Sequence, residues 1–420
     1  MTVTEKIICR AAGCDRVKPG DEVWAKVDLA IMNDTSGPRR IAPTIESLGG
    51  RLWDPDRVVL VADHFIPAAN SRHAEILSLT RRWAAEKRIP HFYEYQGILH
   101  NIVLEKRLAQ PGMLIAGADS HTVTAGAVGA VAVPVGSKEL ATVLVTGEIW
   151  LRVPETVCVR LNGELPMGVM ARDIDFHILG ALKSEFALYR AVEFAGPLVA
   201  SLSMDERSVL TNAGIEMGAK NAIVPADART WAWYVDERVN PANDNLTHDP
   251  EADYACVHEF DISHLEPQVA LPHRVDEVAG VSSVSGLPIV VAHIDSCVGA
   301  KLSDLRAAAQ VLRGRTVRVP LIVTPATRTT YEIALQDGTL ATLVEAGAVI
   351  QTPGCGPCAG LHMGVLAAGE RTIASITRNF RGRMGSPESE VFLASPQTVA
   401  ASAIEGRVAD PRPYVAERRV

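Results

Sequence analysis

Short apolar runs rich in Val and Ile alternate along this chain with stretches of helical periodicity. Residues 57–65 (RVVLVADHF) and 112–122 (GMLIAGADSHT) each read as a buried strand that runs into a polar loop, and residues 287–297 and 316–325 repeat the pattern. Residues 70–89 have helical periodicity and begin with an Asn suited to capping a helix. Strands that alternate with helices predict an α/β fold in which helices cover parallel sheets on both faces.

Chemically capable side chains directly follow three of the predicted strands. They are Asp63 and His64; Asp119, Ser120 and His121; and Asp295, Ser296 and Cys297. A single His or Asp in a loop is more often a satisfied polar residue than a catalyst. Ligands of open α/β sheets, however, bind at the carboxyl ends of the strands, where all of these residues are predicted to lie. The repeated arrangement therefore favours one composite functional site.

The chain has 420 residues, more than one hydrophobic core usually organises, so several domains are expected. Shifts in composition near Pro154 and at the proline-flanked stretch 266–272 predict three domains, at residues 1–155, 156–268 and 269–420. The net charge of the chain is −8, which argues against nucleic acid or an anionic membrane as the main partner. The sequence shows neither a signal-peptide pattern nor an apolar run long enough to cross a bilayer, so a cytoplasmic protein is expected.

Two of the seven cysteines, Cys355 and Cys358, stand in the Gly- and Pro-rich segment PGCGPCAG at residues 353–360. Glycines in this segment allow the backbone to approach a bulky cofactor and to point N–H groups at it. The C-x-x-C spacing fits a redox pair, although a thioredoxin-like pair would open a helix early in a βαβ unit. Together with Cys297, the spacing fits a zinc site completed by His362 and an iron–sulfur cluster about equally well.

Eight motifs in a fixed order then point to a family. They are DLAIMNDTSGP (28–38), VADHFIP (61–67), GILHNIVLE (97–105), GADSHTVTAGAVGA (117–130), LTNAGIEMGA (210–219), IDSCVGAKLSDLRAAA (294–309), GCGPCAG (354–360) and TRNFRGRMGSPESEVFLASP (377–396). With these motifs the chain resembles the large subunits of the aconitase superfamily, of the 3-isopropylmalate dehydratase and homoaconitase type. The resemblance covers essentially the whole chain.

The resemblance implies a three-domain large subunit with parallel and mixed sheets, flanked by helices around a central cluster cleft. It also implies that the swivel domain is absent from this chain, and that a separate small subunit supplies that domain together with the catalytic base. Cys297, Cys355 and Cys358 match the three cysteines that hold a [4Fe-4S] cluster in the family. Three thiolates leave one iron without a protein ligand, so that this iron can act as a Lewis acid.

The implied reaction is the removal and addition of water at a hydroxy dicarboxylic or tricarboxylic acid. The residues that match the proton-handling pairs of the family are His100 with Asp119, His64 with Asp63, and His121 with Glu216. A carboxylate beside an imidazole orients the ring and raises its pKa. Arg378 and Arg383 match the arginines that bind substrate carboxylates, whereas Arg381 reads as a solvated neighbour. Ser120 and Asn212 match positions near the cluster and the substrate.

The chain departs from the family text at three places near these motifs. Val298-Gly299 replaces the usual Thr-Asn after the first cluster cysteine, Asn33 replaces the His of a His-Asp pair, and Thr377 replaces an Asn. The cysteines, both Asp-His motifs and both arginines are retained, so the departures bear on the lining of the pocket. Isopropylmalate of leucine biosynthesis is the expected substrate, and a methyl- or dimethyl-substituted malate or homocitrate is the alternative.

Three other interpretations are compatible with the sequence. The chain could be an iron–sulfur regulator that binds RNA, which the acidic net charge disfavours. It could be a zinc-dependent hydro-lyase that uses Cys297, Cys355, Cys358 and His362. It could also be a paralogue that has lost activity through the changes at residues 298, 299 and 377. The expected partners are the small subunit and a small hydroxy-diacid, with neither nucleic acid nor a membrane among them.

Overall fold

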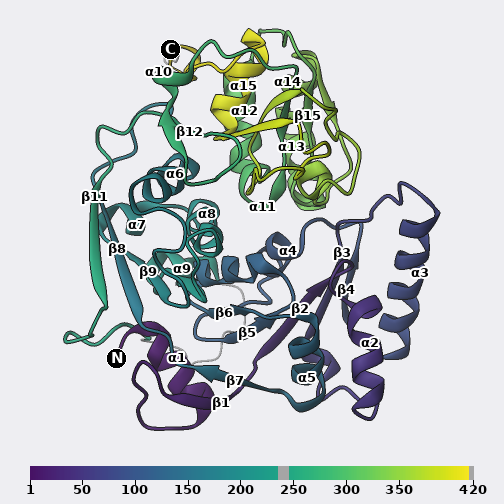
Figure 1. Ribbon diagram of the computed structural model, residues 1–420, viewed down its shortest axis with the longest axis vertical. Helices are drawn as coiled ribbons and strands as arrows, with labels where there is room; N and C mark the ends of the chain where they lie inside the picture. The colour runs from purple at the N-terminus through teal and green to yellow at the C-terminus, as the bar shows by residue number, and fades with distance from the viewer. Residues whose placement is uncertain (235–245, 416–420) are drawn as a thin grey trace.

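The computed structural model describes residues 1–234 and 246–415, and its strands form four sheets (Figure 1). The first large sheet has the order β4–β3–β2–β5–β6 and is entirely parallel. Its strands are β2 (Leu29–Asn33), β3 (Val58–Ala62), β4 (His91–Glu94), β5 (Leu114–Gly117) and β6 (Val131–Pro134). The helices around it are α1 (Val3–Ala12), α2 (Pro38–Ser47), α3 (Ser71–Glu86), α4 (Leu99–Glu105), α5 (Ser137–Thr146) and the short helices η1 (Pro55–Arg57) and η2 (Ser120–Val128).

The continuous apolar run of β3 follows from burial on both faces of this sheet. Val58 and Leu60 pack into one hydrophobic core with residues of α1, α2, α3 and α5. Val59 and Val61 point the other way, into a second core with residues of α4 and η2. Because successive side chains of a strand alternate between faces, a strand covered on both sides offers no solvent-facing position for a polar side chain.

The second sheet, β10–β9–β8–β11, is also parallel. Its strands are β8 (Thr156–Asn162), β9 (Ala191–Ala195), β10 (Asn221–Ile223) and β11 (Cys256–Asp261). The helices of this part are α6 (Ala171–Leu182), α7 (Pro197–Ser201), α8 (Met204–Asn212), η3 (Ala213–Ile215) and α9 (Ala228–Trp233). A separate two-stranded antiparallel ribbon joins β1 (Glu22–Lys26) to β7 (Glu148–Arg152).

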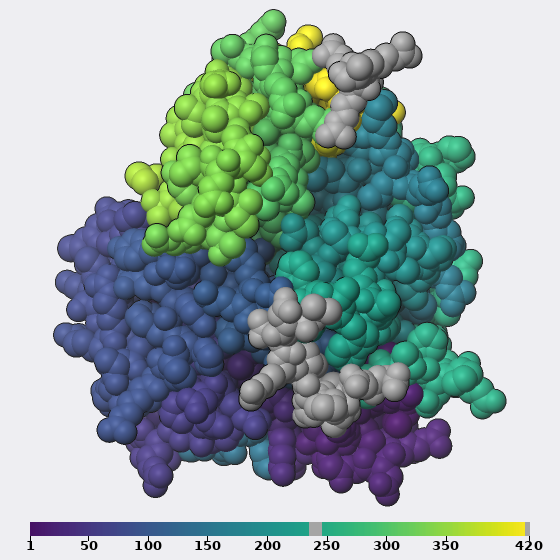
Figure 2. All heavy atoms as spheres, turned by 180° about the vertical axis from the view of Figure 1, so that it is seen from behind, coloured from purple at the N-terminus to yellow at the C-terminus, as the bar shows by residue number. Residues whose placement is uncertain are grey.

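The third large sheet is mixed and has the order β13–β12–β18–β17–β14–β15–β16, in which β12 runs antiparallel to both neighbours. Its strands are β12 (Gln268–Ala270), β13 (Val278–Gly280), β14 (Val291–Ile294), β15 (Leu321–Val323), β16 (Ala348–Ile350), β17 (Arg371–Ala374) and β18 (Glu390–Ala394). The helices are α10 (Val281–Val284), α11 (Ser296–Gly299), α12 (Leu302–Leu312), α13 (Arg328–Gln336), α14 (Thr339–Glu345), α15 (Pro396–Glu405), α16 (Arg412–Val415) and η5 (Gly356–Ala359). Seen from behind, this C-terminal part sits on the blue and teal segments of the first two sheets (Figure 2).

The expected α/β fold with parallel and mixed sheets is therefore present. The predicted helix is α3, and the side chain of Asn70 caps it by accepting the N–H of His73 at 3.0 Å. It ends at Glu86, earlier than predicted, because Arg88 adopts a left-handed conformation (φ 54°) that turns the chain. Each large sheet uses one continuous stretch of chain, and the division into domains at residues 155 and 268 stays a prediction. Among the helices of the described segments, none has the length and apolar character needed to span a bilayer.

Candidate active site

The loops that follow β3, β5 and β14 meet, and the residues at their starts are the Asp and His residues of the sequence motifs. Asp63 and His64 follow β3, Asp119 to His121 follow β5, and Cys297 lies in the short helix α11 after β14. In Figure 1 these elements face one another where the C-terminal part of the chain approaches the first sheet. The carboxyl ends of strands from two different sheets thus border one site, as expected for α/β folds.

One group of side chains is Asp34, Asp63 and His64. The Nδ1 atom of His64 lies 2.6 Å from Oδ1 of Asp63 and 3.6 Å from Oδ1 of Asp34. Asp34, fully buried at the end of β2, also accepts the backbone N–H groups of His64 and Phe65 at 3.2 and 3.0 Å. Burial opposes a charge on His64, but the two carboxylates outweigh it and raise the pKa of His64 well above its ordinary value.

A second group contains His100, Asp119, His121 and Glu216. The Nε2 atom of His100, on α4, lies 2.9 Å from Oδ1 of Asp119, and Nε2 of His121 lies 3.4 Å from Oε1 of Glu216. The rings of His100 and His121 meet edge to face at 6.0 Å between centroids. The Oε1 atom of Glu216 also accepts Nε of Arg378 at 2.5 Å. The four predicted site residues of this group and the predicted substrate-binding Arg378 are therefore linked by a continuous series of side-chain contacts.

Charges in this second group set one another's protonation. Burial would raise the pKa of Glu216, but His121 and Arg378 outweigh burial and lower it to about 2. His100 and His121 likewise hold the pKa of Asp119 well below its usual range against the effect of burial. In the opposite direction, the carboxylates of Glu216 and Asp119 raise the pKa of His121. The group is thus built to keep carboxylates ionised and to hold a proton on an imidazole.

The three candidate ligand cysteines are free thiols next to these groups. Cys297 and Cys358 are buried and Cys355 is partly buried. Two hydrogen-bond donors point at their sulfurs: Nδ2 of Asn212 lies 3.2 Å from Sγ of Cys297, and Nη2 of Arg383 lies 3.5 Å from Sγ of Cys358. Burial raises the pKa of Cys297 to about 12, whereas the thiol of Cys355 and the guanidinium of Arg383 hold the pKa of Cys358 well below its ordinary value.

Asp295 ties the two cysteine loops to each other. Its carboxylate, fully buried at the end of β14, accepts the N–H of Cys358 at 3.2 Å and also the N–H of Ser296. A Cβ at Gly356 would lie 2.9 Å from both carboxylate oxygens of Asp295, so the close approach requires glycine. The other side of the cysteine loop is held by the N–H of Cys355, which donates to the carbonyl of Asp63 at 2.9 Å.

The geometry distinguishes sites for a single metal ion from a site for a larger group. A single zinc with bonds of about 2.3 Å to sulfur needs its ligands roughly 4 Å apart. Among the described residues, the groups whose ligand atoms all lie within 4.8 Å are His100–Asp119–His121 and Asp34–Asp63–His64, and the three cysteines form no such compact set. His362 instead directs Nε2 to the carbonyl of Pro67 at 3.0 Å. Three thiols that form no compact set, with donors on the sulfurs of Cys297 and Cys358, fit an iron–sulfur cluster.

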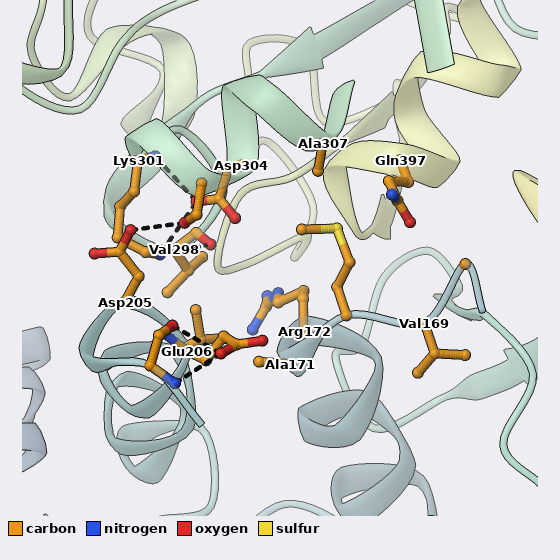
Figure 3. A pocket seen from close by; sticks show the side chains of 15 residues that line it. Val169, Ala171, Arg172, Asp205, Glu206, Val298, Lys301, Asp304, Ala307 and Gln397 are labelled. Carbon is orange, nitrogen blue, oxygen red and sulfur yellow. Dashed lines mark hydrogen bonds and ion pairs between the residues drawn. The ribbon is translucent and has the colours of Figure 1, made fainter. Parts of the chain in front are cut away.

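Surface pockets reach the site from two sides. One of about 340 Å³ is lined by Glu216 and Arg378, and another of about 660 Å³ by Asp119 and Ser120, whose Oγ lies 3.4 Å from Nδ1 of His121. A third pocket, of about 350 Å³, is lined by Val298, the residue after Cys297, and by Lys301 (Figure 3). None of the predicted site residues lines this third pocket, into which Arg172 extends from α6.

Several supporting residues lie outside the site predicted from the sequence. In the sequence, Asp34 belongs only to a motif that departs from the family text, and Asp295 only follows a predicted strand. Arg172 is buried and donates Nη2 to the carbonyls of Ile376 and Thr377 at 2.8 and 3.4 Å, so it holds the backbone next to Arg378. Asn101 donates Nδ2 to the carbonyl of Cys297 at 3.2 Å. The sequence pattern that could identify Asp34 and Asp295 is their position directly after a buried strand. No local sequence pattern identifies Arg172.

Comparison with known proteins decides what this arrangement belongs to. The model of the aconitase family (aconitate hydratase) matches residues 5–286 and 281–406. The chain belongs to the aconitase family. It is 46% identical over 417 residues to the 3-isopropylmalate dehydratase large subunit 1 of Methanopyrus kandleri, with 99% of each chain covered. It is 44% identical over 419 residues to the probable methanogen homoaconitase large subunit of Methanothermobacter thermautotrophicus, with 98% of each covered.

As a member of the aconitase family, the chain is a hydro-lyase related to isopropylmalate dehydratases. The fold is that of the family as well. The crystal structure of the holo-form of aconitase X from Thermococcus kodakaraensis matches with a TM-score of 0.52 at 13% identity, over 93% of this chain and 97% of the other. At that identity the likeness concerns the fold alone.

Proposed function

We propose that this chain is the large subunit of an iron–sulfur dehydratase whose substrate is a hydroxy dicarboxylic acid, with 3-isopropylmalate as the first candidate. The observation that carries the proposal is the pair of donors on the cysteine sulfurs, from Asn212 to Cys297 and from Arg383 to Cys358. Side chains that donate to thiolate sulfurs are typical of a cluster site. The imidazole–carboxylate pairs beside them supply the proton chemistry that a dehydratase needs.

Cys297, Cys355 and Cys358 would hold a [4Fe-4S] cluster. With three protein ligands, such a cluster supplies one open iron that serves as a Lewis acid toward a hydroxyl and a carboxylate of the substrate. Asn212 and Arg383 would stabilise negative charge on the sulfurs, and Asp295 would fix the positions of the two ligand loops relative to each other. The engagement of His362 with Pro67 supports the cluster over the zinc alternative.

The three imidazole–carboxylate pairs would handle the proton of the departing water. His64 lies between two carboxylates and His121 between Asp119 and Glu216, so the pKa of each imidazole is raised and its protonated form is favoured. An imidazolium of this kind donates its proton to the leaving hydroxyl, and the adjacent carboxylates stabilise the charge before transfer. His100, held in place by Asp119, would orient the leaving hydroxyl from the other side.

Arg378 and Arg383 would bind the substrate carboxylates. Arg378 borders the pocket that opens to Glu216, and its ion pair with Glu216 fixes the guanidinium before substrate arrives. Arg383 is shared between Cys358 and the ring of Phe380, 5.5 Å from its guanidinium carbon. Ser120 lies on the rim of the other pocket and is placed to contact substrate there. Planar guanidinium groups held in this way favour bidentate binding of a carboxylate.

A small subunit would complete the enzyme. The similar proteins of Methanopyrus kandleri and Methanothermobacter thermautotrophicus are named as large subunits, which implies a partner for them. We infer that a small subunit that carries the swivel domain binds this chain, closes the site and supplies the base that removes the carbon-bound proton. The closed complex would act on a small acid in the cytoplasm, without nucleic acid or a membrane as a partner.

Homoaconitase activity is the second candidate, because the homoaconitase large subunit is nearly as similar to this chain as the isopropylmalate enzyme. A methyl- or dimethylmalate is the third, because Val298 and Gly299 stand where the family usually has Thr and Asn after the first cluster cysteine. All three candidates share the hydroxy-diacid core that the arginines would recognise, and they differ in the side group.

The test begins with the full chain purified without oxygen. Roughly four iron and four sulfide per chain are expected. The chain is then mixed with its small subunit and assayed for hydration of the unsaturated diacids derived from isopropylmalate, homocitrate and dimethylmalate. Turnover of the isopropyl compound at the highest kcat/KM supports the first candidate. A colourless, zinc-loaded chain, or an iron–sulfur protein with no turnover of any of these acids, would overturn the proposal.

A further inference from the structure

The two-stranded ribbon carries two tryptophans directly opposite each other. Trp24 on β1 pairs with Trp150 on β7, and their side chains are 61% and 49% exposed. The other face of the ribbon, with Ala25, Ile149 and Leu151, is buried in the N-terminal core. Directly opposed residues of an antiparallel pair place their side chains on the same face, about 4.5–5.5 Å apart at Cβ. The anchored ribbon therefore presents a pair of indole rings to solvent.

An exposed pair of this size is unusual on a surface with no partner. A fully buried aromatic side chain covers about 150–250 Å², of which roughly half is still exposed at each of these positions, and Trp is enriched at the energetic centre of protein interfaces. Leu188 and Tyr189 add exposed apolar surface beside the end of the ribbon, where the hydroxyl of Tyr189 lies 3.5 Å from the carbonyl of Arg152. A contiguous apolar patch indicates a site of association.

Four charges frame the indole pair in an alternating pattern. In the register of the ribbon, Glu22 lies opposite Arg152 on one side of the tryptophans, and Lys26 lies opposite Glu148 on the other side. The two acidic residues are thus at diagonal corners, and the two basic residues are at the remaining corners. Within the part of the chain that the structure describes, none of the four side chains is in an ion pair. They are free to pair with charges on another molecule.

We propose that the face formed by Glu22, Trp24, Lys26, Glu148, Trp150 and Arg152 docks on the same face of a second copy of this chain. The alternating corners make the face complementary to itself. If two copies meet about a two-fold axis parallel to the strands, Glu22 meets Arg152 and Lys26 meets Glu148 of the other copy. If the axis is perpendicular to the strands, Glu22 meets Lys26 and Arg152 meets Glu148. Either arrangement pairs opposite charges around a core of four indoles, which is the usual apolar centre and polar rim of an interface.

The position of the ribbon is compatible with the proposed enzyme. In Figure 1, β1 and β7 lie at the end of the molecule away from α11 and the loops after β3 and β14. A second copy bound there leaves the active-site loops accessible to a small subunit. The inference does not depend on the proposed reaction, because it rests on the ribbon alone.

Sedimentation velocity of the full, anaerobically purified chain tests the proposal. A dimer is expected at micromolar concentration, and Trp24→Ser with Trp150→Ser should raise its dissociation constant roughly 100-fold or more. The control is Leu335→Ser on α13, an equally exposed apolar residue outside the ribbon, which should leave the dimer intact. Far-UV circular dichroism checks that each variant is folded. A monomeric wild-type chain, or a dimer that survives the double tryptophan change, would overturn the proposal.

Charge exchange gives an independent readout and assigns the axis. Glu22→Lys alone should weaken the dimer about tenfold, because like charges then meet in both arrangements. Glu22→Lys with Arg152→Glu restores it only for an axis parallel to the strands, and Glu22→Lys with Lys26→Glu only for a perpendicular axis. Restoration by one exchange supports the proposal. Failure of both, or tryptophan variants that lose the small subunit instead of the second copy, would overturn it.

Discussion

The side-chain amide of Asn212 is held between Thr124 and Cys297. Its Nδ2 atom lies 2.8 Å from Oγ1 of Thr124 and 3.2 Å from Sγ of Cys297. Thr124 belongs to η2, the segment that begins with Ser120 and His121. One buried amide at the end of α8 therefore contacts both the segment after β5 that carries His121 and the first candidate ligand cysteine.

Replacing this amide should loosen the proposed cluster. In Asn212→Leu the sulfur of Cys297 loses its donor, and loss of such a supporting contact typically costs about 10–100-fold in metal affinity. We expect correspondingly faster bleaching of the visible absorbance in air and a lower iron content. Asn70→Ala is the control, since it removes a helix cap worth about 1 kcal/mol without touching the cysteines. Equal bleaching rates in Asn212→Leu and wild type would contradict the expectation.

Gly356 should tolerate no side chain. A Cβ there would lie 2.9 Å from the carboxylate of Asp295 and from Oγ1 of Thr324, and φ is +54°. Gly356→Ala is therefore expected to displace the loop of Cys355 and Cys358 and to reduce iron incorporation. Gly369→Ala is a matched control, because Gly369 also has a positive φ (+76°) but no atom within 4 Å of the added carbon.

Iron and sulfide analysis after anaerobic reconstitution measures both glycine variants. The left-handed conformation alone costs roughly 1–2 kcal/mol for alanine, and both variants bear this cost. Only Gly356→Ala adds the clash. Similar iron content in the two variants would show that the close approach to Asp295 is not required.

Arg378 and Arg381 should differ sharply although they are three residues apart. Arg378 is fixed by Glu216 and borders the pocket, whereas Arg381 is exposed. Arg378→Lys keeps the charge but loses the planar fork, so kcat/KM with the small subunit present should fall roughly 100-fold. Arg381→Lys should change it by less than about twofold. Steady-state kinetics of both variants measures the difference. Equal losses of kcat/KM would contradict the proposed substrate-binding role of Arg378.

Glu216→Gln should make stability less dependent on acid pH. The pKa of Glu216 is lowered from 4.5 to about 2 in the folded chain, by His121 and Arg378 against the effect of burial. A lowered pKa means that the carboxylate contributes stability that is complete above pH 4.5 and is lost as the pH falls toward 2. The contribution is about 3 kcal/mol.

Thermal unfolding of wild type and Glu216→Gln between pH 7 and pH 3 measures this effect. At neutral pH the thermal unfolding midpoint of Glu216→Gln should be lower than that of wild type. The difference between the two midpoints should narrow as the solution becomes acidic. The variant also removes a carboxylate that raises the pKa of His121. The stability that His121 contributes below its ordinary pKa of 6.5 should therefore be lost at a lower pH in the variant. A gap that stays constant with pH would contradict the assignment of the ion pair.

The sequence anticipates the scaffold of the site better than its internal contacts. β3, β5 and β14 are recognisable because burial on both faces favours apolar runs, interrupted in β14 only by the buried His293, and the polar residues after them mark the carboxyl edge of each sheet. The cap of α3 by Asn70 is equally local. These features depend on residues that are neighbours in the chain.

Contacts between distant segments leave no such local mark. Asp34 reaches His64 from another strand, and Asp295 reaches Cys358 from another loop. Arg172 holds the carbonyl of Ile376 from α6, 204 residues earlier in the chain. Which side chains meet is fixed by how the three sheets pack, and one sequence does not reveal this. The roles proposed for the cysteines and histidines stay predictions that rest on resemblance to a family.

Asp63 joins the two halves of the site through different atoms. Its carbonyl accepts the N–H of Cys355, while its carboxylate contacts His64 and accepts the N–H of Leu99, at the start of the helix that carries His100. A shift of this one residue would disturb the loop of Cys355 and Cys358 and two imidazoles together. A substitution at Asp63 is therefore expected to affect the proposed cofactor site and the proposed proton transfer at the same time. The visible absorption spectrum and the pH–rate profile would both change.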